Sequence, residues 1–162
     1  MPDGKTVFWG HLNDGGIRAV DLETRKVCVL PQTDDLWYPK CSRQGRILVT
    51  RGAGTSAAYW TYDPRTGRRE DLGVRETLTY PNFTRDGQSV IGLSLGLGEG
   101  PPLGMYGFSL RERRLQKVAD LGAIRPTSSL FSPWAGLDPD DAPIVLNDTG
   151  SHEIYVLELE QP

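Results

Sequence analysis

The chain of 162 residues has no long apolar run and little net charge. No segment approaches the ~20 apolar residues that cross a bilayer, so membrane insertion is not expected. The net charge of −3 leaves no basic field that would attract nucleic acid. Residues 1–15 lack the basic and apolar stretches of a signal peptide, which predicts a cytoplasmic protein. A periplasmic location is expected instead if the chain is a fragment of a larger exported protein.

Residues that hold metals or form disulfides are scarce, with two histidines and two cysteines. His11 and His152 lie in polar turns without a further His or Cys at ligand spacing, so no zinc site is expected. The acidic cluster at 138–141 could offer oxygen ligands to Ca²⁺, but its spacing is not that of an EF-hand, which favours a solvated turn. Cys28 and Cys41 fall in different strands and are expected to be buried, unpaired thiols. No metal or cofactor is predicted.

Glycine and proline are plentiful, with 19 and 12 residues, and both disfavour helices. Four segments, starting at residues 1, 38, 80 and 132, share one rhythm of a short strand-like stretch, a tight turn and an apolar run. The turn glycines Gly4, Gly45 and Gly87 are 41 and 42 residues apart. Asp86-Gly87 predicts a type I′ hairpin turn, with positive φ at both central residues. The fourth copy has Asp140-Asp141 instead and is expected to carry an extra residue or two.

A second series of segments repeats in step with the first. It comprises residues 18–22, 60–64, 106–110 and 155–159, with Asp21, Asp63, Ser109 and Glu158 at matching positions. A further short run follows each of the first three. The unit is therefore four short strands in about 42 residues, which is typical of a β-propeller blade. Runs such as 47–50 are apolar at successive positions, as expected of strands covered on both faces.

The repeat resembles a known family. Residues 39–46 (PKCSRQGR), 81–88 (PNFTRDGQ) and 2–5 (PDGK) are similar to the Pro-x-Trp-Ser-Pro-Asp-Gly-Lys motif of TolB-like, WD-repeat-like bacterial β-propellers. Those propellers are related to the propeller of prolyl-oligopeptidase-type peptidases. Residues 120–159 resemble the last blade of propellers that end bacterial multidomain regulators. The motif tryptophan is Cys41 in one copy and Phe83 in another, and it is shifted to Trp134 in the fourth.

These observations predict an all-β chain that forms one propeller segment. Its approximate blades are 1–31, 36–73, 78–122 and 130–160, of which the first lacks its innermost strand and the last its outermost. That makes about three and a half four-stranded antiparallel blades, whereas closed propellers have about 4–8. We therefore expect open strand edges that invite pairing with another chain. The chain is either the carboxyl-terminal piece of a larger propeller or completes a ring with a second copy.

One motif suggests catalysis but lacks the context for it. Gly92-Leu-Ser94-Leu-Gly96 matches the G-x-S-x-G nucleophile elbow, and Asp148 and His152 follow in the order of that class. An elbow needs a helix after the serine, and residues 95–104 are too rich in Gly and Pro to form one. The same loop lacks the G-K-[ST] ending of a phosphate-binding loop. The sequence predicts a strand that ends in a glycine-rich loop, and a protein that is not an enzyme.

Aromatic residues supply the remaining functional signal. Trp37, Tyr38, Tyr80 and Phe131 precede the expected innermost strands, where loops crowd one mouth of a propeller. Aromatic side chains dominate binding hot spots, so these four form the candidate binding surface. Packing between adjacent blades is the alternative role. The resemblance implies a non-enzymatic binding or sensory module with a protein or peptide partner. Its alternatives are the gating propeller of a prolyl-oligopeptidase-type serine peptidase and a TolB-like envelope scaffold.

Overall fold

The computed structural model describes residues 1–11, 14–52, 57–97, 100–125 and 134–150. Within these ranges the chain has thirteen strands and no helix, which confirms the all-β prediction. It follows that the described part holds no helix able to cross a lipid bilayer. Every sheet is antiparallel, and its strands are neighbours in the order of the sequence.

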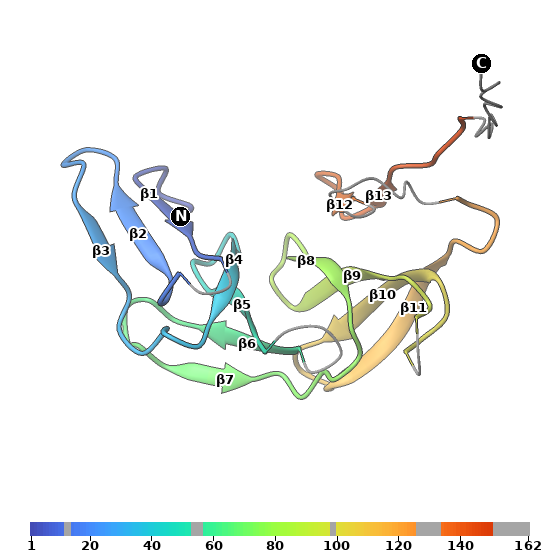
Figure 1. The fold of residues 1–162 in the computed structure, drawn as a ribbon, viewed down its shortest axis with the longest axis horizontal. Helices are drawn as coiled ribbons and strands as arrows, with labels where there is room; N and C mark the ends of the chain where they lie inside the picture. Colours follow the sequence, from blue (N-terminus) through green and yellow to red (C-terminus); the bar gives the residue numbers. More distant parts are fainter. Residues whose placement is uncertain (12–13, 53–56, 98–99, 126–133, 151–162) are drawn as a thin grey trace, which may run out of the picture.

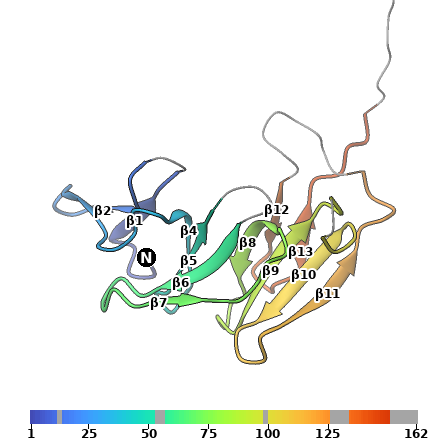
Figure 2. The same ribbon diagram turned by 60° about the horizontal axis from the view of Figure 1, so that its bottom comes forward.

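Four sheets follow one another along an arc (Figures 1 and 2). The inner side of the arc is formed by β1, β4, β8 and β12, and the outer side by β3, β7 and β11. This arrangement is that of a partial β-propeller, as predicted. The first sheet contains β1 (Thr6–Trp9), β2 (Arg18–Asp21) and β3 (Val27–Val29); the second β4 (Trp37–Cys41), β5 (Ile47–Arg51), β6 (Ala58–Tyr62) and β7 (Arg69–Asp71); the third β8 (Thr79–Phe83), β9 (Ser89–Ser94), β10 (Gly104–Ser109) and β11 (Arg114–Asp120); the fourth β12 (Ala135–Leu137) and β13 (Pro143–Val145).

The hairpin turn of the repeat recurs in all four units. The N–H of its fourth residue donates to the carbonyl of its first, from Gly4 to Met1, Gly45 to Ser42, Gly87 to Thr84 and Asp141 to Asp138. The fourth residue has a left-handed φ in each case, 67°, 83°, 67° and 66°. The predicted type I′ turn is wrong, because Asp86 is not left-handed. The loops have three or four residues rather than two, and such loops place one left-handed residue after an ordinary turn.

The fourth unit follows the same turn geometry as the second. Asp138 donates its N–H to Ala142, just as Ser42 donates to Arg46. The extra residue expected in this copy is therefore absent from its turn. Asp141 takes the place of the glycine. An aspartate adopts the left-handed conformation more readily than most other side chains do.

The second series of segments ends in another recurring turn. The carbonyls of Asp21, Asp63 and Ser109 each accept the N–H four residues later. Their side chains also accept backbone N–H groups, from Thr24, Arg65 and Glu112 respectively. Such donors favour the ionised carboxylate, so they lower the pKa of Asp21 and Asp63 below its ordinary value of 3.8. Glu158 lies outside the described residues.

The core lies between the sheets, in three separate clusters. Alternate residues of β5 serve different clusters: Ile47 and Val49 pack toward the first sheet, and Leu48 toward the third. Alternate residues of β9 behave likewise, since Val90 faces the second sheet and Ile91 the fourth. Each interior sheet therefore buries apolar side chains on both faces, as propeller blades do.

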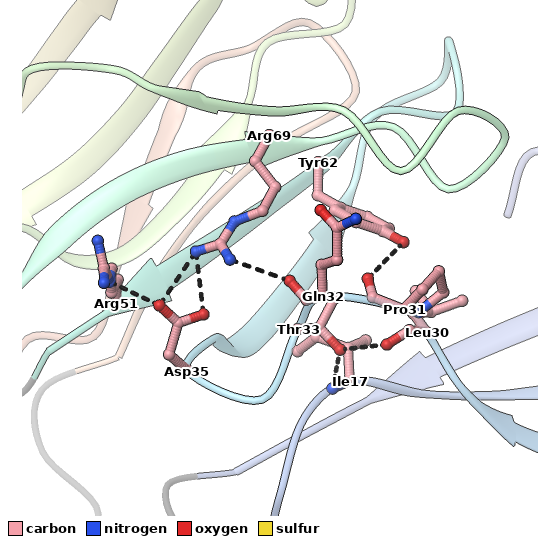
Figure 3. Close-up of polar contacts among 9 residues, drawn as sticks. All are labelled: Ile17, Leu30, Pro31, Gln32, Thr33, Asp35, Arg51, Tyr62 and Arg69. Atoms are coloured by element: carbon pink, nitrogen blue, oxygen red, sulfur yellow. Dashed lines mark hydrogen bonds and ion pairs between the residues drawn. The ribbon is translucent and has the colours of Figure 1, made fainter.

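Polar contacts fix the loop between the first two sheets, residues 30–36 (Figure 3). Arg69 donates to both carboxylate oxygens of Asp35, at 2.9 and 3.1 Å, and Arg51 pairs with the same carboxylate at 2.7 Å. The loop is thereby bound to the sheet that follows it. Its other bonds run from Ile17 N–H to Thr33 Oγ1 (2.9 Å), Thr33 Oγ1 to the Leu30 carbonyl (2.8 Å), Arg69 to the Gln32 carbonyl (3.1 Å) and the Tyr62 hydroxyl to the Pro31 carbonyl (3.1 Å).

The two cysteines depart from expectation, because both are exposed rather than buried. Cys28 lies in β3, the outermost strand of its sheet, whose three residues are all exposed. Cys41 ends β4, and its Sγ lies 3.5 Å from Sδ of Met1. Neither forms a disulfide. The error arises because alternation along a strand does not reveal which strands end a sheet.

Removing the Tyr59 hydroxyl should weaken the contact between the second sheet and the segment that leads into the third. This buried hydroxyl accepts the Leu78 N–H at 2.9 Å and donates to the Leu78 carbonyl at 2.5 Å. Tyr59→Phe leaves both backbone groups without their partner, which costs about 1–3 kcal/mol of unfolding free energy. Tyr62→Phe, which loses one bond at a partly buried carbonyl, should cost less. Urea denaturation measures both; an equal loss in the two variants would contradict this role.

Asp63 should contribute to acid unfolding. The pKa of Asp63 is lower in the folded chain than its ordinary value of 3.8. The ionised carboxylate therefore stabilises the fold fully at pH values above 3.8, and this stabilisation is lost as the pH falls through the folded pKa. Asp63→Asn keeps an acceptor but does not titrate, so its stability difference from the parent should shrink between about pH 5 and pH 2. Ser109→Ala alters the matching turn without a titrating group, and its difference should stay constant. Urea denaturation across this pH range would refute the role if both differences were constant.

Candidate functional site

The inner strands of the second, third and fourth sheets surround a cavity of about 350 Å³, here called the channel cavity. Of these three strands, β8 contacts both β4 and β12, and all three lie on the inner side of the arc (Figure 1). The cavity wall includes residues 40–43 from the end of β4 and the turn after it. Residues 82–85 contribute the same part of the third sheet, and residues 134–139 that of the fourth. Equivalent pieces of three consecutive repeats therefore form one site.

Hydrogen bonds between successive hairpin turns hold this wall together. Arg46 donates to the Gly87 carbonyl at 2.8 Å, which joins the second turn to the third. The Arg85 N–H donates to both carboxylate oxygens of Asp141, at 2.8 and 3.0 Å, which joins the third turn to the fourth. Gly45 and Gly87 are 42 residues apart and Gly87 and Asp141 are 54 apart, so it is the stacking of equivalent turns that brings donors and acceptors together.

The charges in the cavity differ in how far they are already engaged. Asp138 accepts the N–H groups of Asp140 and Ala142, both at 2.8 Å, and Asp141 is held by Arg85 as above. Lys40 and Arg43 also line the cavity, and neither forms an ion pair within the described residues. Three cationic side chains line the cavity, Lys40, Arg43 and Arg85, against two carboxylates, Asp138 and Asp141, so the formal charge of the lining is 3 − 2 = +1.

The acidic cluster at 138–141 is a turn in the structure, with the side-chain bonds described above. Across the described ranges, no three His, Cys, Asp or Glu side chains are grouped so that they could hold a metal ion.

Tyr38 and Tyr80, two residues of the predicted binding surface, occupy equivalent positions. Each is the second residue of an inner strand and has a left-handed φ, 55° for Tyr38 and 49° for Tyr80. Each also lies where the pairing with the next strand shifts register. Tyr80 lines the channel cavity, whereas Tyr38 is exposed and its hydroxyl lies 3.2 Å from Nε2 of His11.

Trp37 lies in a different hollow, of about 430 Å³, which it lines together with Trp60. Its indole N–H donates to the Gly52 carbonyl at 3.1 Å. Phe131 lies outside the described residues. Of the three predicted residues that the structure describes, Tyr80 lies in the channel cavity, and Trp37 and Tyr38 lie elsewhere.

The cavity also contains residues that the sequence pattern does not single out, chiefly Lys40, Arg43 and Trp134. The prediction that Trp134 is a shifted copy of the motif tryptophan does not match the strand pairing. Leu137 takes that position, because it pairs with Pro143 as Phe83 pairs with Val90. Trp134 then corresponds to Tyr80, three residues earlier. Starting the fourth copy at residue 132 matches Pro133 with Pro39 and Pro81, and that match gives the wrong register although Asp140-Asp141 is placed at the turn.

Ser94 is the last residue of β9, and the described residues that follow it, 95–97 and 100–102, are not helical. Its buried hydroxyl donates to the Pro101 carbonyl at 2.5 Å and accepts the Gly96 N–H at 3.3 Å. The hydroxyl thus holds the loop between β9 and β10. His152, the expected third member of a triad, lies outside the described residues.

Comparison with known proteins gives structural relatives only. No family model matches the chain, and no curated protein is similar to it in sequence. TolB from Acinetobacter baumannii has a TM-score of 0.69 and 19% identity, over 93% of this chain and 37% of that one. An oligogalacturonate lyase in complex with manganese has a TM-score of 0.60 and 13% identity, over 85% and 40%. A puromycin-hydrolyzing peptidase from Mycobacterium tuberculosis has a TM-score of 0.53 and 20% identity, over 88% and 23%.

These proteins have different activities, so the likeness concerns the fold alone. The chain spans two fifths or less of the length of each. The match extends over most of the chain, and its sheets follow one another in an arc. The chain therefore has a TolB-like β-propeller fold.

Proposed function

We propose that the chain is a non-enzymatic binding module that holds a segment of a protein or peptide partner in the channel cavity. The observation that carries the proposal is the convergence of three repeats on that cavity. Its volume of about 350 Å³ is within the usual range of ligand sites, about 300–1,000 Å³. The rest of the ring would come from a longer chain, of which this segment is the carboxyl-terminal part, or from a second copy.

The side chains of the cavity favour a partner segment that carries an acidic group. Lys40 and Arg43 are uncommitted cations, and a charged hydrogen bond to a carboxylate is about twice as strong as a neutral one. Tyr80 and Trp134 offer rigid aromatic surface, which is characteristic of binding hot spots. Asp138 and Asp141 keep their negative charge, but with Arg85 the cations of the lining outnumber them by three to two, so the net charge also favours an acidic group.

Two other functions remain alternatives to this proposal. A TolB-like envelope scaffold would act in the periplasm, and a gating propeller would serve a serine peptidase whose catalytic domain lies elsewhere. The engagement of the Ser94 hydroxyl with Pro101 supports a structural role for this serine. The neighbouring coding sequence discriminates among the three. A winged-helix or kinase domain supports the binding module, a hydrolase domain the peptidase, and an export signal the scaffold.

Peptides selected from a random library should bind through the two cations. Lys40→Ala and Arg43→Ala should each weaken a selected acidic peptide about 10-fold, because each removes about 1.5 kcal/mol of charge-assisted bonding. Isothermal titration calorimetry measures the affinity. Both side chains are exposed, so the melting temperature should not change.

Lys26→Ala is the matched control, since it removes an exposed cation at the β2–β3 turn, remote from the cavity. It should bind like the parent. Equal weakening by all three variants would indicate a general charge effect and would overturn the assignment of the cavity. Failure to select any peptide would argue against a binding module.

A further inference from the structure

The first sheet exposes an apolar face. Val7, Val20 and Val27 are directly paired across β1, β2 and β3, so their side chains share one face of the sheet. Trp9 and Val29 lie on the same face, because both are paired with Arg18. Val7 is 46% exposed and Val27 58%, and Trp9 and Val29 are also exposed. The opposite face, with Phe8 and Ala19, packs against the second sheet.

This exposed face corresponds to one that is buried in the next two sheets. The amino group of Met1 donates to the Thr6 carbonyl, and in the third sheet the Thr84 N–H donates to the Ser89 carbonyl. Thr6 is therefore equivalent to Ser89, and the next residue, Val7, is equivalent to Val90. Val90 in turn matches Ile47, because each is paired with the last residue of the preceding strand. Ile47 and Val90 are 0% and 3% exposed, because each is covered by the preceding sheet. The first sheet therefore carries a blade-to-blade contact surface that no described residue covers.

The other end of the arc carries the complementary surface. Ala135, Leu137 and Val145 of the fourth sheet pack toward the third. The alternate residues Trp134, Ile144 and Leu146 point to the other face and are exposed. This is the side on which a following sheet would pack. The two ends thus present the two different halves of one sheet-to-sheet contact.

We propose that a second copy of this chain covers both faces, with the β12–β13 face of each copy packed on the first sheet of the other. Every contact between successive sheets in the chain joins these same two kinds of face, so the new contact continues an interface that already occurs. Two such contacts, related by a two-fold axis, close the pair and cover both faces of each copy. The assembly has eight sheets, which lies within the 4–8 blades of closed propellers.

The arc of Figure 1 supports this closure, because its two ends lie far apart with the inner strands on the concave side. The channel cavity is walled by the ends of β4, β8 and β12 and the turns that follow them, and a second copy would bring its own inner strands to the remaining side. Ring closure thereby buries both apolar faces and completes the channel.

The oligomeric state is measured by size-exclusion chromatography with light scattering over a dilution series of the full chain. The parent should have twice the mass of the 17.9 kDa chain at high concentration. Val29→Lys, whose cross-strand partner is Arg18, and Leu146→Glu at the other face should each weaken the dimer at least about 100-fold, because each buries an unpaired charge. Leu97→Lys, at an exposed loop residue outside both faces, should leave the dimer unchanged. Circular dichroism checks that each variant is folded.

Mixing the Val29→Lys and Leu146→Glu variants identifies the mode of contact. A head-to-tail pair can bring the introduced carboxylate of one copy against the introduced ammonium group of the other, while the second contact keeps its native residues, so the mixture should recover the dimer. Three results would overturn the proposal: a parent that stays at 17.9 kDa, which would assign the faces to further blades of a longer chain; a dimer insensitive to Leu146→Glu, which would indicate packing of two first sheets; and a mixture that stays monomeric.

Discussion

Each sheet in this chain is apolar on both faces and can bury them only against its neighbours. In the second sheet Ile47 and Val49 require the first sheet, and Leu48 and Tyr59 require the third. A single blade has no core of its own, so its stability depends on the contacts with the blades beside it. Sequence repetition, strand order and the arc all follow from this constraint. So does the difference between the interior sheets and the two at the ends.

The same stacking creates the candidate site. Because consecutive blades repeat one geometry, their inner strands and hairpin turns meet at one place, where Arg46 reaches Gly87 and Arg85 reaches Asp141. The cavity there belongs to no single repeat. In such an assembly, equivalent positions of the repeats need not contribute equally to the site. Tyr80 and Trp134 correspond in the repeat, and both line the cavity, yet Tyr38 at the same position of the second sheet lies outside it.

Strand order and sheet number could be predicted because turn residues and apolar runs recur at a fixed period. The turn type could not be predicted from Asp86-Gly87 alone, since the loop length selects it. The sequence places the fourth turn at Asp140-Asp141, but the left-handed φ of Asp141 could not be predicted, because residues with that φ are usually glycine. The site was only partly predictable. The aromatic pattern predicts Tyr80 but neither Lys40 nor Arg43, because their lack of ion-pair partners among the described residues depends on contacts between repeats. The exposure of Cys28 likewise depends on its being in an outermost strand.

Protection of the backbone should come from neighbouring blades rather than from pairing within a sheet. Native-state hydrogen exchange of the chain, at a concentration where it is monomeric, tests this most directly. Amides of β5, β6, β9 and β10, whose sheets are covered on both faces, should exchange most slowly. Those of β2 and β13 should exchange faster, since each of their sheets has one exposed apolar face. Equal protection in all four sheets would contradict this claim, because it would show that each blade is stable by itself.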